Sequence, residues 1–181
     1  NYTNVYNPFT QLETSHPNNT DERLLANGYL EIKPWEWLTF KSSISMNRYS
    51  WQNRSYREKY HFSDYDTNVK NSVSAALGRS TEMFYENTLT FAKKFAGKHD
   101  VSFMVGQTTE EYNYDSLSGN GSTLLVTDPN RWYVSNTTED KNSSDAVART
   151  RRLSFLGRFF YSYDNRYLVT ANFRADASSK F

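Results

Sequence analysis

The most regular feature of the sequence is an alternation of apolar and polar residues with a period of two, which is typical of strands that bury one face. It runs through residues 24–32 and resumes at 38–47. The segment between them contains Pro34, whose missing N–H costs no ladder bond in a turn, so we predict a hairpin with Pro34 in its turn. Alternation at 83–91 and 101–108 predicts a second hairpin.

The third predicted hairpin has the clearest pattern. Residues 152–163 alternate, a tight turn follows at Asp164, Asn165 and Arg166, and residues 167–175 alternate again. Asp and Asn tolerate the backbone conformations that tight turns need. The fold class that we predict is therefore all-β, with about six long strands in three antiparallel hairpins.

The connections between these strands alternate between short and long. Residues 50–81 and 110–150 are polar and are predicted to be long loops, both at the same end of the meander. A short helix over residues 68–79 is a further expectation, because Val69 and Val73 begin a spacing near 3.6. Loops of this length are uncommon in compact domains, whereas outer-membrane barrels have short turns on the periplasmic side and long loops outside.

Composition narrows the possible classes. The chain has 181 residues, a net charge of +1, no cysteine and a mean hydropathy of −0.82. A near-zero charge gives no footprint for nucleic acid, and the absence of cysteine excludes disulfides and thiolate metal sites. No run approaches 18 apolar residues, so a spanning helix is excluded, and a chain this polar could cross a bilayer only as a β-barrel.

Aromatic residues make up 17% of the chain and gather at strand ends and in the predicted loops. Rings at strand ends are typical of the two interfacial girdles of a membrane barrel, although aromatics also favour strands in general. The predicted membrane-interface residues are Trp35, Trp37, Tyr161, Tyr163 and Tyr167. The aromatic residues of the predicted loops could contact a ligand or a protein that covers the loops as a lid, or they could pack on one another. They are Trp51, Tyr56, Tyr112, Tyr114, Trp132 and Tyr133.

The polar face of the predicted strands carries charges of both signs. In a barrel such a face looks into the lumen, because an arginine toward the lipid midplane costs roughly 2–4 kcal/mol. The lumen-facing candidates are Glu31, Lys41, Glu86, Arg152, Arg158 and Arg174.

Nothing in the sequence indicates catalysis or a cofactor. His16, His61 and His99 are isolated, and solvated loop histidines are the better interpretation. The neighbouring carboxylates Glu110 and Glu111 point to opposite faces of a strand, which argues against a catalytic pair. We therefore predict no enzyme activity, no metal and no cofactor.

One family has the same motifs in the same order. Residues 153–181, LSFLGRFFYSYDNRYLVTANFRADASSKF, resemble the mid-barrel hairpin of SusC-like TonB-dependent outer-membrane transporters of Bacteroidota. Residues 7–13 and 27–31 resemble the start of that barrel section, and residues 87–107 resemble its central hairpin. The resemblance covers nearly the whole chain and is uninformative about the substrate.

The resemblance implies that the chain, over residues 1–181, is an internal segment of an outer-membrane β-barrel without its plug domain or signal peptide. Six strands cannot close a membrane barrel, since the smallest need about eight. The implied function is active nutrient uptake, of oligosaccharides in the first place and of peptides as the alternative. The implied partners are the rest of the barrel and its plug, a SusD-like surface lipoprotein, the TonB complex and outer-membrane lipid.

A soluble β-sandwich that binds carbohydrate is the alternative from another class. It would also alternate and would also expose loop aromatics, but it would bury its apolar face against a second sheet. Its strands would be about 5–6 residues long, whereas the alternation here continues for nearly twice that length.

Overall fold

The computed structural model describes residues 8–64, 66–126 and 128–180. Two residues of the family motifs, Asn7 and Phe181, lie outside this part of the chain. The elements are α1 (Pro8–Thr14), β1 (Ser15–Trp35), β2 (Leu38–Arg57), β3 (Tyr60–Ser63), β4 (Asp66–Asn68), β5 (Ser72–Phe95), β6 (His99–Leu124), η1 (Pro129–Arg131), η2 (Val134–Asn136), β7 (Thr137–Tyr163) and β8 (Tyr167–Ser178).

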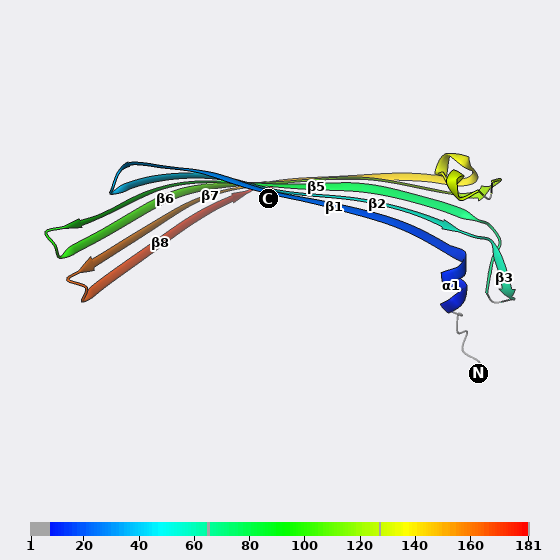
Figure 1. Cartoon of the computed structure of the whole chain (residues 1–181), viewed down its shortest axis with the longest axis horizontal. Helices are drawn as coiled ribbons and strands as arrows, with labels where there is room; N and C mark the ends of the chain where they lie inside the picture. Colours follow the sequence, from blue (N-terminus) through cyan, green and yellow to red (C-terminus); the bar gives the residue numbers. More distant parts are fainter. Residues whose placement is uncertain (1–7, 65, 127, 181) are drawn as a thin grey trace, which may run out of the picture. The chain divides into compact units, whose positions relative to one another are not determined.

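Six long strands form one sheet in the order β1-β2-β5-β6-β7-β8, so each strand neighbours the next long strand along the chain (Figure 1). This confirms the predicted all-β class and the three hairpins. A second, two-stranded sheet pairs β3 with β4. Within the described residues, the six-stranded sheet has no second large sheet of the kind that the β-sandwich alternative requires.

The strands are longer than the alternation predicted, and this corrects several bounds. β2 continues to Arg57 and β5 begins at Ser72, so much of the segment predicted as the first long loop is strand. β6 and β7 likewise extend into the segment predicted as the second loop. The helix predicted over residues 68–79 is wrong, since β5 occupies most of that range. Pro34 lies within β1, and the turn follows at Glu36 and Trp37.

The contacts divide the chain into two compact units. The loop unit comprises the described residues up to Glu22, with Tyr49–Arg79 and Tyr114–Val147. The turn unit comprises Arg23–Arg48, Ser80–Asn113 and the residues from Ala148 onward. Each long strand except β8 contributes residues to both units.

The sheet buries few side chains. Among the described residues, the buried hydrophobic side chains are Tyr56, Val73 and Leu124, all in the loop unit. The accessible surface is 13532 Å², against about 9,000 Å² for a globular protein of this mass. No helix of the described residues is long and apolar enough to cross a lipid bilayer. A sheet with so little core needs something else to cover its faces.

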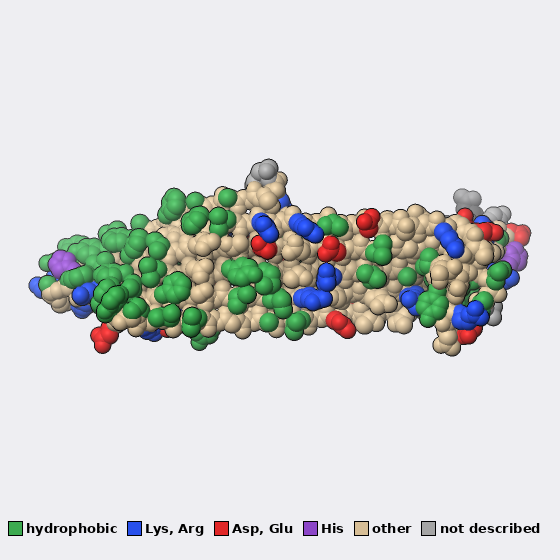
Figure 2. Space-filling model, turned by 90° about the horizontal axis from the view of Figure 1, so that it is seen from above, with side chains coloured by type: hydrophobic (Ala, Val, Ile, Leu, Met, Phe, Trp, Pro, Cys, Tyr) green, Lys and Arg blue, Asp and Glu red, His purple; other side chains and the backbone are tan. Residues whose placement is uncertain are grey.

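In the turn unit the register of β7 against β8 separates two faces. Phe155 lies opposite Ala175 and Phe159 opposite Ala171 on one face, which we call the apolar face. Arg158 lies opposite Asn172 on the other, which we call the polar face. Hydrophobic side chains gather at the short-turn end on the face seen in Figure 2.

Candidate functional site

The polar face continues across the strands of the turn unit. Arg23 Nε of β1 donates to Asn47 Oδ1 of β2 over 3.0 Å, and Asn47 Nδ2 donates to Glu82 Oε2 of β5 over 2.8 Å. Close packing around Gly106 links β5, β6 and β7, because a Cβ placed there would lie 2.6 Å from Leu156 Cδ1 and 3.2 Å from Thr88 Cγ2. Side chains from β1 to β8 therefore share this face.

All six predicted lumen-facing residues lie on the polar face. Glu31 and Lys41 alternate in step with Arg23 and Asn47, and the Lys41 ammonium lies 4.9 Å from the ring centre of Tyr29. The remaining four are placed there by alternation from Glu82 on β5 and by the β7–β8 register; they are Glu86, Arg152, Arg158 and Arg174. That this face looks into a barrel lumen remains a prediction.

A polar hollow of about 260 Å³ lies on this face. Arg152 Nη1 donates to Glu110 Oε2 over 3.1 Å at its wall, and Tyr112, Ser178 and Lys180 complete one side. Both partners of the Arg152–Glu110 pair are about half exposed. Charges of both signs in an open hollow can hold water or meet the polar surface of another domain, and they form no catalytic arrangement.

The predicted membrane-interface aromatics lie beside the short turns of the turn unit. Trp35, the last residue of β1, stacks on Trp37 in the first turn, with ring centres 5.0 Å apart. Beside the others, His99 Nδ1 lies 2.8 Å from the hydroxyl of Tyr161, and its ring centre lies 5.0 Å from that of Tyr163. Tyr163 in turn stacks on Tyr167 at 6.4 Å. His99, expected to be solvated, is instead part of this aromatic group.

Among the predicted loop aromatics, Trp51 lies in surroundings that suit contact with a ligand. It lines an open hollow of about 450 Å³ in the loop unit, together with Asn19, Asp21, Tyr49, Gln52 and Asn53. The indole ring lies against Gly78, where a Cβ would come within 2.6 Å of Trp51 Cε2. An aromatic ring flanked by amides and a carboxylate offers both stacking and hydrogen bonding to a ligand.

Tyr56 and Trp132 correct the prediction for the loop aromatics. Tyr56 is only 5% exposed, and its ring stacks on Trp132 with centres 4.0 Å apart. His16 stacks on the same indole at 5.3 Å, and its Nε2 lies 2.9 Å from Glu58 Oε1. These rings pack together in the small core of the loop unit, where Tyr56 is buried and Trp132 is partly buried.

The remaining loop aromatics occupy different places. Tyr112 and Tyr114 lie within β6 rather than in a loop. Tyr133 lies between η1 and η2 and is 45% exposed, and the Arg54 guanidinium lies 4.8 Å from its ring centre. The structure therefore does not bring the six predicted loop aromatics together as one site.

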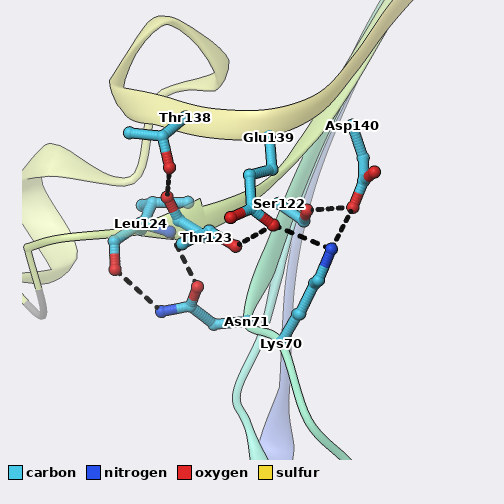
Figure 3. Close-up of polar contacts among 8 residues, drawn as sticks. All are labelled: Lys70, Asn71, Ser122, Thr123, Leu124, Thr138, Glu139 and Asp140. Carbon is cyan, nitrogen blue, oxygen red and sulfur yellow. Dashed lines mark hydrogen bonds and ion pairs between the residues drawn. The ribbon is translucent and has the colours of Figure 1, made fainter.

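A network of polar contacts that the sequence analysis missed holds the loop unit together (Figure 3). Asn71 lies just before β5 and makes two contacts with Leu124, at the end of β6. Asn71 Oδ1 accepts from the Leu124 N–H over 2.7 Å, and Asn71 Nδ2 donates to the Leu124 carbonyl over 3.2 Å. The side chain thus closes the two strands as a backbone pair would. Its neighbour Lys70 contacts Glu139 and Asp140 of β7 at 2.7 and 3.1 Å.

Two residues of this network have left-handed backbones without being glycine. Thr123 has φ 60° and Asp140 has φ 50°, a conformation that costs energy unless its surroundings hold it. The Thr123 N–H donates to the Asn71 carbonyl over 2.9 Å, and its Oγ1 donates to Glu139 over 3.1 Å. Asp140 accepts from Ser122 over 2.5 Å. The network therefore fixes the backbone where β6 ends and β7 begins.

These contacts shift the pKa values of the charged groups of the network. Hydrogen bonds from Lys70 and then Thr123 lower the pKa of Glu139 below 4.5. Hydrogen bonds from Ser122 and then Lys70 lower the pKa of Asp140 below 3.8. The pKa of Lys70 is raised above 10.5, first by Glu139 and then by Asp140. All three groups stay charged between these limits.

Comparison with known proteins finds a TonB-dependent receptor and peptide transporters that are similar to this chain. No family model matches the sequence. The chain is 28% identical over 185 residues to the TonB-dependent receptor P39 of Formosa agariphila, a match that covers 97% of this chain and 17% of that protein.

Solved structures show the same fold. The chain superposes on the RagAB peptide transporter with a TM-score of 0.86 and 21% identity, over 96% of this chain and 19% of the other. The open-open state of the RagAB peptide importer gives a TM-score of 0.85 with the same coverage, and the closed-closed state gives 0.83 over 93% of this chain.

The solved structures show the predicted fold, a sheet like a segment of these transporters, and the curated relative is a TonB-dependent receptor, the class that the sequence motifs resemble. They also confirm the barrel interpretation of the sheet. The chain spans less than a fifth of the length of the proteins it matches.

Proposed function

We propose that this chain forms part of the wall of an outer-membrane importer that takes up nutrients with energy from TonB and with a SusD-like surface lipoprotein. The observation that carries the proposal is a sheet with a polar and an apolar face and almost no core, in a chain similar along 97% of its length to a TonB-dependent receptor. The polar face would look into the lumen and toward the plug, and the apolar face toward lipid.

We propose oligosaccharides as the substrate class, and the hollow beside Trp51 supports this. Sugar rings stack on indoles, and the amides of Asn19 and Asn53 can bond their hydroxyl groups. Peptides are the second candidate, which the similarity to a peptide transporter favours.

Uptake by the full-length transporter tests both candidates. A strain lacking the gene would be complemented with the wild type, and uptake of labelled oligosaccharide and oligopeptide pools would be measured with and without a protonophore. We expect protonophore-sensitive oligosaccharide uptake and co-purification of a surface lipoprotein. Uptake of peptides alone would reject the oligosaccharide assignment, and energy-independent uptake of both would reject TonB-driven import.

Trp51→Ala tests the hollow itself. Loss of one stacking contact should raise the oligosaccharide concentration that gives half-maximal uptake about two- to tenfold. Trp35→Ala is the matched control, since Trp35 is 55% exposed and lies at a short turn of the other unit. Equal effects of the two substitutions would show that Trp51 does not contact substrate.

A further inference from the structure

The apolar face of the turn unit carries a groove centred on Gly157. Along β7 and β8 each phenyl ring lies opposite a small residue: Phe155 opposite Ala175, Phe159 opposite Ala171, and Phe173 opposite Gly157 itself. The missing side chain between Phe155 and Phe159 opens a groove of about 450 Å³. Its walls are almost wholly apolar and include Phe103, Val105, Phe155, Phe159, Ala171 and Phe173.

Gly157 lies midway along the apolar part of β7. Arg151 precedes Gly157 by six residues along β7, and Tyr163, at the short turn, follows it by six. Six residues of strand span about 20 Å. With a tilt of about 45°, this is about 14 Å along the membrane normal, close to half of the roughly 30 Å hydrocarbon core. In a barrel wall of this tilt, the groove would lie at the depth of the bilayer midplane, where acyl chains end.

Arg151 belongs to the same face, on the part of β7 that precedes the groove. It continues the β7–β8 register, since its carbonyl accepts from the Ser179 N–H over 3.0 Å. Its side chain is 75% exposed, and Nε lies 3.1 Å from Glu111 Oε1. That contact engages one of the five N–H donors of a guanidinium. The remaining donors can form the bidentate contact that phosphate favours.

We propose that this face binds one phosphate-bearing lipid of the outward leaflet, with an acyl chain in the groove over Gly157 and the phosphate on Arg151. The proposal rests on the membrane location given under the proposed function. Such a site would hold one lipid more tightly than the surrounding bilayer does. The groove has a definite volume, Arg151 can bind the phosphate, and about one acyl-chain length separates the two.

Gly157→Leu would place a side chain in the groove at a position where the backbone accepts a Cβ. A Cβ at Gly157 would meet its nearest neighbours, the Met104 carbonyl and Phe173 Cβ, at 4.0 Å, which is ordinary contact. Gly28→Leu is the matched control, because Gly28 has similar space, with Ile44 Cγ2 at 3.9 Å, and lies on another strand of the same unit. Gly157→Ala provides a milder variant.

The test is native mass spectrometry of the full-length transporter, delipidated in mild detergent and titrated with lipid A. We expect the wild type and Gly28→Leu to retain one lipid more than Gly157→Leu, whose affinity should fall at least tenfold. Arg151→Gln should weaken lipid A binding several-fold and leave binding of an uncharged diacylglycerol unchanged. Arg166→Gln, a 78% exposed arginine at the short turn, is its control.

Equal lipid retention by the wild type and Gly157→Leu would overturn the proposal, as would a change of oligomeric state in Gly157→Leu, which would assign the groove to a second copy. If inorganic phosphate competes with lipid A at Arg151 and Gly157→Leu has no effect, Arg151 binds an anion and the groove binds no acyl chain. This outcome would also reject the proposal. Uptake is measured on the same variants, so normal import with unaltered lipid binding would reject the lipid site and leave the proposed function standing.

Discussion

The loop unit and the turn unit are built from largely the same strands and are stabilised in different ways. The loop unit holds itself through a small aromatic core and a network of side-chain contacts around Asn71. The turn unit buries no hydrophobic side chain among its described residues and presents Phe173 67% exposed and Phe155 53% exposed. The first unit is ordered by its own residues, whereas under the proposed function the second depends on lipid and on what fills the lumen. This contrast between the two units can be tested in the full-length protein.

The largest effect is expected from removing the core of the loop unit. Tyr56→Ala removes the stack with Trp132 and His16, and truncation of a buried aromatic costs about 3–5 kcal/mol. We expect amide hydrogen exchange to rise in the loop unit and to stay unchanged in the turn unit. Leu125→Ala, at an 80% exposed position of the same unit, should have no such effect. Faster exchange spread over both units would show that they do not differ in this way.

A charge on the apolar face should act through the membrane. Phe155→Arg places a guanidinium two residues from the expected midplane, at a cost of about 2–4 kcal/mol for insertion. Folding into lipid vesicles, followed by urea titration, should show this loss. Leu125→Arg is the control, because Leu125 is exposed in the loop unit. If both variants insert as the wild type does, the apolar face does not meet lipid.

Asn71 should matter less than Tyr56 but more than any exposed pair. Asn71→Ala leaves the N–H and carbonyl of Leu124 without their side-chain partners, at about 1–3 kcal/mol. Asn71→Asp retains the acceptor for the Leu124 N–H and should lose only part of this. Amide exchange at Leu124 measures the difference. Equal protection in Asn71→Ala and the wild type would mean that the backbone alone holds β6 and β5 together here.

The smallest effect is the pH dependence of the Lys70 network. The pKa values of Glu139 and Asp140 are lowered, so their stabilisation is present above 4.5 and 3.8 and is lost as the pH falls through the lowered values. The pKa of Lys70 is raised, so its part persists below 10.5 and is lost as the pH rises through the raised value. Proteolysis of the loop unit should accelerate at both extremes, and Lys70→Met should flatten the profile. An unchanged profile in that variant would rule out the ion pairs as its source.

The sequence allowed the hairpins, the tight turn at Asp164–Arg166 and the two faces of the sheet to be predicted, because apolar and polar residues alternate there. It did not reveal the outer parts of the strands. The first half of β7 is polar on both faces, so no period marks it as strand, and only pairing with neighbouring strands makes it one. Val73 and Leu77 fit a helical spacing, but they also fit a period of two with Ala75, and the sheet decided between them.

The predicted lumen-facing residues share one face because alternation alone determines the face of a strand residue. The loop aromatics were assigned less well. The stacking of Tyr56 on Trp132 joins residues 76 positions apart, and no local pattern encodes such a contact. The Asn71 contacts with Leu124 were missed for the same reason, since they join residues 53 positions apart.

The central claim is that one face of the turn unit meets lipid and the other meets water. Asn172 and Phe173 are neighbours on β8 and lie on opposite faces, and the chain has no cysteine of its own. Single cysteines at these two positions, in the full-length transporter freed of any other cysteine, can be labelled with a membrane-impermeant maleimide in vesicles. We expect Asn172→Cys to react and Phe173→Cys to stay protected until detergent is added. Equal labelling of both, or protection of Asn172→Cys alone, would contradict the account.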